Sequence, residues 1–216
     1  MNRDTKQPLR DFDQAAARWD QEPRRVQLAH AVADGIIKEA RPCTATRMLD
    51  FGCGTGLVTL ALAPLVGEIV AADSSQGMLE QLTDKCVTGG ITMVKPLLLP
   101  PDGSGALPDG ERFDLVVSSM TMHHIADVGG LVKRFHDSLL SGGQLCIADL
   151  DREDGSFHDD PTGVQHNGFS RAEMESFLSS AGFVDIRTVR VWEVRKSRPE
   201  GDQIYPVHLT IGRCTD

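Results

Sequence analysis

LDFGCGTG, residues 49–56, joins a short apolar run to an amphipathic one and carries three glycines at alternate positions. Glycine lets the backbone turn tightly and lets a ligand approach it closely, and the amino end of a following helix adds partial positive charge. Seventeen residues beyond Gly56, Asp73 ends the next apolar run, EIVAAD. An acid at that point can accept hydrogen bonds from a ribose diol. The segment therefore predicts a strand, a binding turn and a helix, with Asp73 beside the same ligand.

Outward from this turn, short apolar runs alternate with helical patterns. The predicted strands are residues 48–51, 68–73, 91–94, 113–119 and 144–150. The predicted helices are 57–66, a segment from about Gly77, and a crossover helix with Leu131, Phe135 and Leu139 that the Gly142-Gly143 pair ends. Strands joined by helices indicate parallel pairing with right-handed crossovers, because a tight turn cannot join parallel strands.

The two ends of the chain complete the pattern. The first forty residues are expected to be helical, since Val26, Ala29 and Ala33 fall near one helix face. Ser170 and Glu173 form a capping box that opens a helix, which Gly182 closes. Residues 184–194 and 204–212 predict a β-hairpin with a long loop, 195–203. The fold class is therefore a doubly wound, Rossmann-like α/β domain with an antiparallel C-terminal hairpin and an N-terminal helical cap.

Composition narrows the class of partner. The 216 residues include 31 acidic and 22 basic ones, and a net charge of -9 disfavours nucleic acid and anionic membranes. The longest uncharged run, 51–67, is too glycine-rich and too short to span a membrane, and the charged N-terminus is unlike a signal peptide. Five cysteines, an odd number without a C-x-x-C pair, indicate free thiols and a cytoplasmic location. A small-molecule partner is expected.

The spacing of the glycines separates two kinds of nucleotide ligand. A dinucleotide fingerprint reads G-x-G-x-x-G, whereas Leu57 stands where its third glycine belongs. Asp50, two residues before the first glycine, would repel a pyrophosphate but would suit an ammonium group. These features favour a nucleoside with an amino acid tail over NAD, and S-adenosylmethionine fits that description.

The motifs also resemble a known family. LDFGCGTG, then VAADSS with Gly77-Met78-Leu79, FDLVVSSMTMHHI and SGGQLCIADL, in this order, resemble the class I S-adenosylmethionine-dependent methyltransferases. The resemblance covers roughly residues 12–195 and is nearest to the small-molecule, methyltransferase-domain type. It implies a seven-stranded sheet whose last hairpin inserts out of order.

The resemblance implies S-adenosyl-L-methionine as cofactor and S-adenosyl-L-homocysteine as product. The implied contacts are Gly52, Cys53 and Gly54 under the methionine end, Asp50 near its ammonium, Asp73 at the ribose, Ser74 and Met78 beside the adenine, and Ser119 and Met120 on the floor below the methyl group. One feature departs from the family. An acid usually follows the third strand directly and takes the adenine amino group, but none stands at the expected place in residues 95–110, and Asp102, farther along this stretch, is the candidate instead.

Histidines are the candidate catalytic bases, because their pKa lies near neutral pH. His124 follows the fourth strand, at the carboxyl edge of the sheet where α/β ligands bind, and His158 and His166 lie in the polar loop 151–169. The loop is long for a simple connection and is expected to roof the acceptor pocket, with Phe157 and Phe169 as apolar walls. His124 could instead hydrogen-bond backbone at a helix entry.

Several weaker signals have structural alternatives. A metal site built from Asp151, Asp154, His158 and Asp159 follows no recognised ligand spacing, so a solvated acidic loop is preferred and no metal is expected. Phe12, Trp19 and Asp20 either close over the cofactor or pack in the core. The basic run 195–198 is interpreted as a solvated loop.

The sequence therefore predicts one domain that transfers a methyl group in line to a small-molecule acceptor. Its expected parts are a cap or lid (1–44), a cofactor-binding core (45–150), an acceptor-side loop (151–169) and a helix with hairpin (170–216). Two alternatives remain open: a catalytically silent S-adenosylmethionine-binding module and, against the loop spacing, an NAD-linked oxidoreductase.

Overall fold

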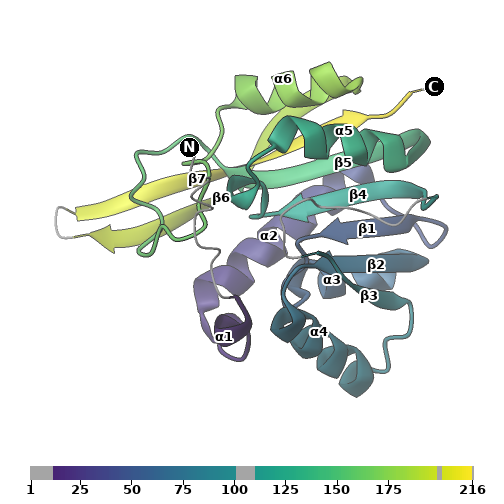
Figure 1. Cartoon of the computed structure of the whole chain (residues 1–216), viewed down its shortest axis with the longest axis horizontal. Helices are drawn as coiled ribbons and strands as arrows, with labels where there is room; N and C mark the ends of the chain where they lie inside the picture. The colour runs from purple at the N-terminus through teal and green to yellow at the C-terminus, as the bar shows by residue number, and fades with distance from the viewer. Residues whose placement is uncertain (1–11, 101–109, 199–200, 216) are drawn as a thin grey trace, which may run out of the picture.

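A central sheet organises the protein (Figure 1), which is described by a computed structural model over residues 12–100, 110–198 and 201–215. In this part of the chain seven strands form one sheet in the order β3-β2-β1-β4-β5-β7-β6. The strands are β1 (Arg47–Phe51), β2 (Glu68–Asp73), β3 (Val94–Leu98), β4 (Phe113–Ser119), β5 (Leu139–Leu150), β6 (Val184–Arg198) and β7 (Gly201–Arg213). β7 runs antiparallel to both β5 and β6, and the other pairs are parallel. The predicted fold class and the out-of-order hairpin are confirmed.

The order of the strands locates the ligand-binding edge. β1 pairs with β2 on one side and with β4 on the other, so the chain reverses its direction of growth across the sheet at β1. In open α/β sheets ligands bind at the carboxyl ends of the strands beside such a reversal. The turn after β1 and the segment after β4 both lie there.

Helices cover both faces of the sheet. They are α1 (Phe12–Ala16), α2 (Pro23–Ala40), α3 (Leu57–Leu62), α4 (Gln76–Gly89), α5 (Val128–Ser138) and α6 (Arg171–Ala181), with short 3-10 turns η1 (Trp19–Gln21), η2 (Ala63–Leu65) and η3 (Met122–His124). Side chains of α2, α3 and α4 share one buried cluster with one sheet face, and those of α5 and α6 share a second cluster with the other. Successive side chains of a buried strand point to opposite faces of the sheet, so Met48 packs in the first cluster and Leu49 in the second.

Several predicted boundaries within the sheet and its crossovers are wrong, and among them the fifth strand is Leu139–Leu150 and not 144–150. The third strand is Val94–Leu98 and not 91–94, and it holds Pro96 because β3 is an edge strand, where a missing N–H can face away from the partner. The crossover helix ends at Ser138, before the glycine pair, because Leu139 already pairs with Phe113 of β4. Gly142 has a φ of 81° and lies in the irregular stretch where the register of β4 and β5 shifts.

The hairpin also differs from its prediction. β6 and β7 remain paired through Lys196–Gln203 and Arg198–Gly201, so strand occupies most of the expected long loop. The capping box of Ser170 and Glu173 is present, and Gly182 ends α6 in a left-handed conformation, as predicted.

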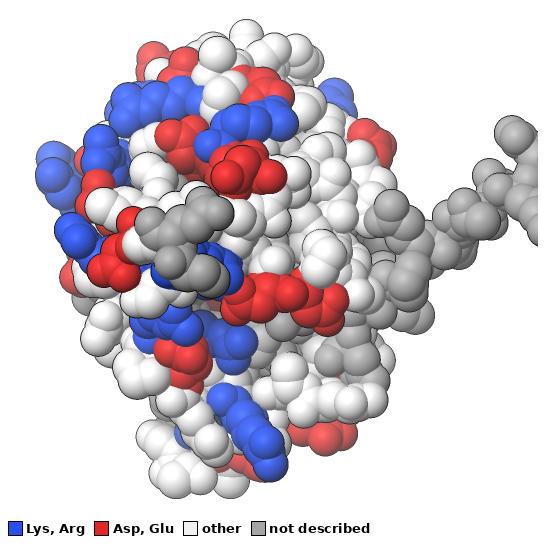
Figure 2. Space-filling view, turned by 90° about the vertical axis from the view of Figure 1, so that its left-hand side faces the viewer, with Lys and Arg blue, Asp and Glu red and all other residues white. Residues whose placement is uncertain are grey.

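Charges at the hairpin end are mixed. Figure 2 shows blue and red side chains interspersed there, and Arg198 and Lys196 both pair with Asp159 of the loop after β5, at 2.5 and 3.5 Å. The basic run 195–198 is therefore the end of strand β6 and not a solvated loop, and two of its four side chains are ion-paired. All five cysteines fall within the described ranges and are free thiols. Across those same ranges, no helix combines the length and the apolar character that crossing a bilayer requires.

Candidate functional site

The glycine turn after β1 leaves one open backbone position. Gly52, Gly54 and Gly56 have positive φ angles of 73°, 54° and 83°, which side chains disfavour. A Cβ atom on Gly52 would lie 2.2 Å from the Thr121 hydroxyl, and one on Gly56 would lie 2.3 Å from Leu82. A Cβ atom on Gly54 would meet nothing within 4 Å. Gly52 and Gly56 thus permit close packing, whereas Gly54 presents bare backbone to open space.

Asp73 connects this turn to the next helix. Its carboxylate accepts hydrogen bonds from the backbone N–H of Gly54 at 2.8 Å and of Ser75 at 2.9 Å. Burial raises the pKa of Asp73, and the backbone hydrogen bonds partly oppose that rise. The side chain that was predicted to hold a ribose therefore lies beside the open face of Gly54. Its contact with a ribose stays a prediction.

Asp50 lies beneath the turn. Its side chain is 1% exposed and accepts a hydrogen bond from the Thr59 hydroxyl of α3 at 2.5 Å. Burial raises the pKa of Asp50 to about 7, and the nearby Asp73 charge adds to the rise. Sequence reasoning missed Thr59, because only the return of α3 over β1 brings it to Asp50. The predicted attraction for an ammonium group would act from this buried position and remains untested.

The other predicted cofactor residues lie around the same edge. Ser74 is exposed, while Met78 on the first turn of α4 is almost fully buried. Ser119 and Met120 are half-buried at the end of β4, and Met120 has a left-handed φ of 56°. Cys53 is buried within the turn. Asp102 lies outside the described residues.

The N-terminal segment binds directly to the turns at this edge. Asp20 of η1 accepts a hydrogen bond from the Thr55 hydroxyl at 2.6 Å and pairs with Lys85 of α4. Lys85 also donates to the Thr55 carbonyl at 2.7 Å. Asp13 of α1 accepts from the Gly77 N–H at 2.8 Å and from the Ser75 hydroxyl, at the start of α4. We call residues 12–21 the lid. Asp20 ties this segment to the glycine turn, and Asp13 ties it to the start of α4.

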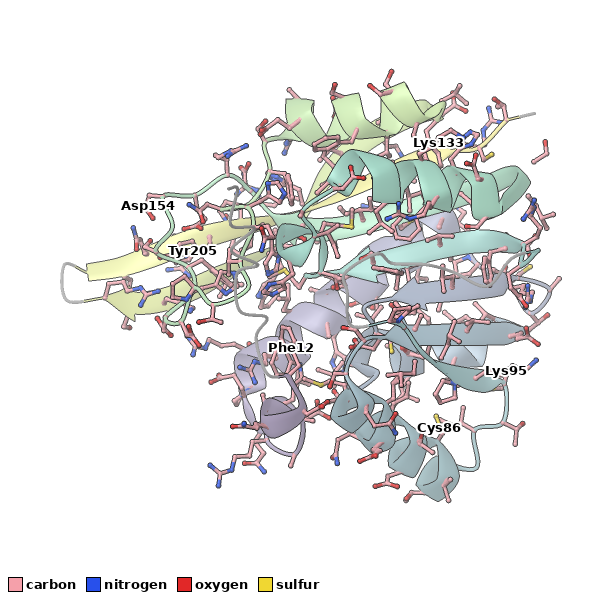
Figure 3. All side chains as sticks on the ribbon, viewed as in Figure 1. Phe12, Cys86, Lys95, Lys133, Asp154 and Tyr205 are labelled. Atoms are coloured by element: carbon pink, nitrogen blue, oxygen red, sulfur yellow. The ribbon has the colours of Figure 1, made fainter. Side chains whose placement is uncertain are left out.

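Three imidazole rings gather beside the lid. His123 and His124 belong to η3, and His158 comes from the loop after β5. Ring centroids lie 4.2 Å apart for His123 and His124, 4.9 Å for His123 and His158, and 5.9 Å for His124 and His158. Phe12 of the lid packs edge-on against His124 at 5.4 Å. Figure 3 labels Phe12, and it labels Tyr205 on the hairpin, above and to the left of Phe12.

The contacts of His124 define the tautomer of its neutral ring. Nδ1 of His124 lies 2.9 Å from the carbonyl oxygen of Gly163. A carbonyl only accepts, so Nδ1 carries the proton and a neutral His124 keeps its lone pair on Nε2. The backbone contact that was the alternative for His124 is therefore present.

His166 lies apart from the three rings. Its Nε2 donates to the Ile125 carbonyl at 3.0 Å, and its ring packs against Phe169 at 5.0 Å. Phe169 is buried with α6, whereas Phe157 packs against Tyr205 in the other core cluster. The two aromatic residues expected to form one pair of walls therefore belong to different faces of the sheet. The loop is held against η3 by backbone, since Gln165 and His166 both donate their N–H groups to the His123 carbonyl.

Sequence reasoning also missed Asp149, the last residue but one of β5, which looked like an ordinary strand residue. It receives a hydrogen bond from Nδ1 of His123 at 2.7 Å, and both side chains are 2% exposed. An acid in an otherwise apolar strand was the available signal. Within the described ranges no three acidic, histidine or cysteine side chains are placed to hold a metal ion.

With this geometry established, comparison with known proteins assigns the family. A family model described as a methyltransferase domain matches residues 49–147, from β1 to β5. An uncharacterized methyltransferase of Schizosaccharomyces pombe is 35% identical over 163 residues, which cover 67% of this chain and 57% of that protein. The chain belongs to the class I S-adenosylmethionine-dependent methyltransferase family.

Two further proteins extend the comparison of this chain. A ubiquinone biosynthesis O-methyltransferase of Mesorhizobium japonicum is 29% identical over 140 residues, covering 65% of this chain and 49% of the relative. The chain thus spans about half the length of these curated relatives. Haemonchus contortus phosphoethanolamine N-methyltransferase 2, solved with phosphomonomethylethanolamine and S-adenosylhomocysteine, shares the fold with a TM-score of 0.68 at 18% identity. That match covers 85% of this chain and 53% of the solved one.

Proposed function

We propose that the protein transfers a methyl group from S-adenosylmethionine to a small-molecule acceptor. The observation that carries the proposal is the bare, left-handed backbone of Gly54, open to a ligand beside the Asp73 carboxylate at the reversal point of the sheet. A methionine chain fits over such a backbone, and a carboxylate suits a ribose diol. Bound there, S-adenosylmethionine would supply an electrophilic methyl group on its sulfonium.

The chain's own residues would position the reactants and exclude water. The lid covers the turn through its contacts with Thr55 and Gly77, which favours a closed site. In-line transfer requires mainly that the two reacting atoms be held at near-attack distance, which is work for fixed backbone and packed rings. Ser119 and Met120 at the end of β4 are the proposed floor beneath the methyl group.

We place the acceptor against the histidine cluster. Of the three candidate bases, we place His124 first, because it follows β4 at the carboxyl edge of the sheet and its ring packs against Phe12 of the lid. His158, whose ring lies beside that of His124, is the second candidate base. His166, which bonds to the Ile125 carbonyl, is the third. Alanine at each position, one at a time, should rank their roles: the base should lose about 10²–10⁴ in turnover and keep its cofactor affinity.

The kind of acceptor is drawn from a relative. One curated relative is an O-methyltransferase of ubiquinone biosynthesis, so hydroxyl-bearing small molecules are the first acceptors to try. Neither nucleic acid nor membrane is proposed as a partner, because the net charge is -9. The five free thiols favour the reducing cytoplasm as the site of action.

Calorimetry and turnover test the proposal in two steps. S-adenosylmethionine and S-adenosylhomocysteine should bind to the full chain, whereas NAD should not. Micromolar binding of NAD without binding of either sulfur compound would replace the proposal with an NAD-linked oxidoreductase. Release of S-adenosylhomocysteine in the presence of a panel of phenols, amines and thiols then separates an enzyme from a silent binding module.

A further inference from the structure

Basic side chains gather on one face of the hairpin, at the end of the molecule that Figure 2 faces. Side chains two residues apart share a face of a strand, so Lys196 and Arg198 of β6 lie on the same face as the buried Val194. Arg195 lies on the opposite face and is exposed. Arg24, in the first turn of α2, lies near enough for its charge to act on Lys196. We call Arg24, Lys196 and Arg198 the cation cluster.

The carboxylates that pair with the cation cluster do not balance its charge. Within the described ranges they are two, Asp159 of the loop after β5 and Glu22. The Asp159 side chain is 73% exposed, so solvent screens its charge. Burial lowers the pKa of Lys196, and Asp159 opposes that change. The charges of Arg198 and Arg24 lower the same pKa again. A further anion beside these cations would therefore be stabilised.

Arg198 carries a donor that the loop does not use. Its Nη1 donates to Asp159 at 2.5 Å, and its Nη2 donates to the carbonyls of Ser156 and Phe157. Its Nε is buried and has no hydrogen-bond partner among the described residues. An unpaired buried donor on a charged group is costly, and a guanidinium binds a carboxylate through two N–H groups at once. A small shift of the loop carbonyls would let a ligand carboxylate accept from Nε and Nη2 together.

One aromatic ring separates the cation cluster from the histidine cluster. Nζ of Lys196 lies 4.6 Å from the centroid of the Phe157 ring and donates to the Phe157 carbonyl. The same ring packs edge-on against His158, with centroids 4.8 Å apart. His158 belongs to the three imidazole rings against which we place the acceptor. An acceptor whose reacting atom lies at these rings would therefore reach the cations with a group about one ring farther along its length.

We propose that the cation cluster selects acceptors that carry a carboxylate, which Arg198 and Lys196 bind while the acceptor's reacting atom lies against the histidine cluster. The inference rests on the proposed function and narrows its substrate class from small molecules to small acids. The cluster lies away from the transferred methyl group, so it binds the carboxylate equally in the ground state and the transition state. Its loss should therefore raise KM and leave kcat unchanged.

Calorimetry with pairs of an acid and its ester tests the binding of a carboxylate without turnover. The probes are para-hydroxybenzoate, para-aminobenzoate and para-mercaptobenzoate, each compared with its methyl ester, added to the full chain saturated with S-adenosylhomocysteine. At least one acid should bind about tenfold more tightly than its ester, as expected for a charge-assisted hydrogen bond. Raising the salt from about 0.05 to about 0.5 M should weaken binding of the acid and leave that of the ester unchanged.

Variants of the cluster assign the effect to its residues. Arg198→Gln and Lys196→Gln each remove one charge, so each should weaken binding of the acid about tenfold and leave the ester as in the wild type. Arg195→Gln is the matched control, because Arg195 is an exposed cation on the other face of the same strand. For an acid that the wild type methylates, KM should rise in the two cluster variants by the same factor at constant kcat.

Opposite results overturn the inference. Binding of no acid, or esters that bind or react as well as their acids, would contradict selection of a carboxylate, and methylation of the esters would leave the proposed function standing. Equal losses for acid and ester in Arg198→Gln would show that the cluster only fastens the loop to the hairpin. Should the glutamine variants fail to fold, the salt dependence of the wild type decides. Acids that bind through Arg198 but are never methylated would support the cluster and contradict the proposed function.

Discussion

Burial of the Asp50 carboxyl makes the stability of the fold depend on pH, because the buried site disfavours the charged form. The unfolded chain ionises this carboxyl at its ordinary pKa of 3.8, whereas burial raises the folded value to about 7. The folded state therefore holds a proton that the unfolded state has lost between these two values. Stability from this group is fully present below pH 3.8 and is lost as pH rises toward 7. The Thr59 hydroxyl is compatible with either an acid or an amide at this position.

Asp50→Asn should remove this pH dependence. The free energy of unfolding of the wild type, relative to the variant, should fall by roughly 1.4 kcal/mol per pH unit between about pH 4 and pH 7. Urea unfolding at several pH values measures the difference, in which the titration of all other groups cancels. A difference that stays constant with pH would show that Asp50 is ionised throughout this range in the folded protein.

Asp73 joins two backbone N–H groups and, in our proposal, the ribose. Asp73→Ala should weaken binding of S-adenosylmethionine by about 1.5–3 kcal/mol, since charge-assisted hydrogen bonds are lost. Asp73→Asn serves as the control for loop geometry, because it retains an acceptor oxygen for the Gly54 or Ser75 N–H. Calorimetry should place the asparagine variant between the wild type and alanine. Equal affinity in all three would remove Asp73 from the binding site.

At the scale of elements, the glycine turn separates packing from binding. Gly54→Ala meets no neighbouring atom and strains only the left-handed backbone, which costs about 1–2 kcal/mol of stability. Its added methyl group should nevertheless abolish measurable cofactor binding by occupying the open face. In Gly52→Ala the new methyl group would clash with Oγ1, Cγ2 and Cβ of Thr121, so this variant should lose more stability than Gly54→Ala. Thermal unfolding and calorimetry of both variants check this contrast, and wild-type binding by Gly54→Ala would contradict the placement of the cofactor.

The lid is a second element whose role can be isolated. Lys85→Met removes the cation that bonds to Asp20 and to the Thr55 carbonyl. Because both side chains are about a third exposed, the pair should contribute only about 0.5–1 kcal/mol. Trypsin cleavage after the exposed Arg18 should then be about two- to fivefold faster, as local opening becomes easier. Lys133→Met, on the exposed face of α5, is the control and should cleave at the wild-type rate. Unchanged cleavage in Lys85→Met would mean that other contacts hold the lid.

For the whole molecule, ligand binding should appear as stability. The proposed cofactor would touch the turn after β1, the start of α4 and the lid. Because only folding brings these three segments together, the cofactor would bind the folded state and not the unfolded state. S-adenosylhomocysteine at a hundred times its Kd should stabilise the protein by about 2.7 kcal/mol. For a chain of this size, that corresponds to a rise of roughly 5–10 °C in Tm. NAD should cause no rise, and Gly54→Ala should show none with either compound. A rise with NAD alone would favour a dinucleotide as the ligand.

Sequence determined the features that depend on near neighbours. The strand, glycine turn and helix at residues 47–62, Asp73 at the end of β2, and the capping box of α6 all follow from periodicity or from a few adjacent residues. The sheet class follows too, because alternating strands and helices leave little choice but parallel pairing.

Tertiary structure decided what depends on residues far apart in the chain. Pro96 became part of a strand because β3 lies at the sheet edge, and α5 stopped before its glycines because Leu139 pairs with β4. The acid at Asp149 looked like one polar residue in an apolar strand until η3 brought His123 against it. Likewise Lys85 and Asp20, 65 residues apart, meet only when the lid lies on α4. Local sequence encodes the propensity of each element, whereas the meeting of two side chains depends on how the elements pack, and burial then sets their charge.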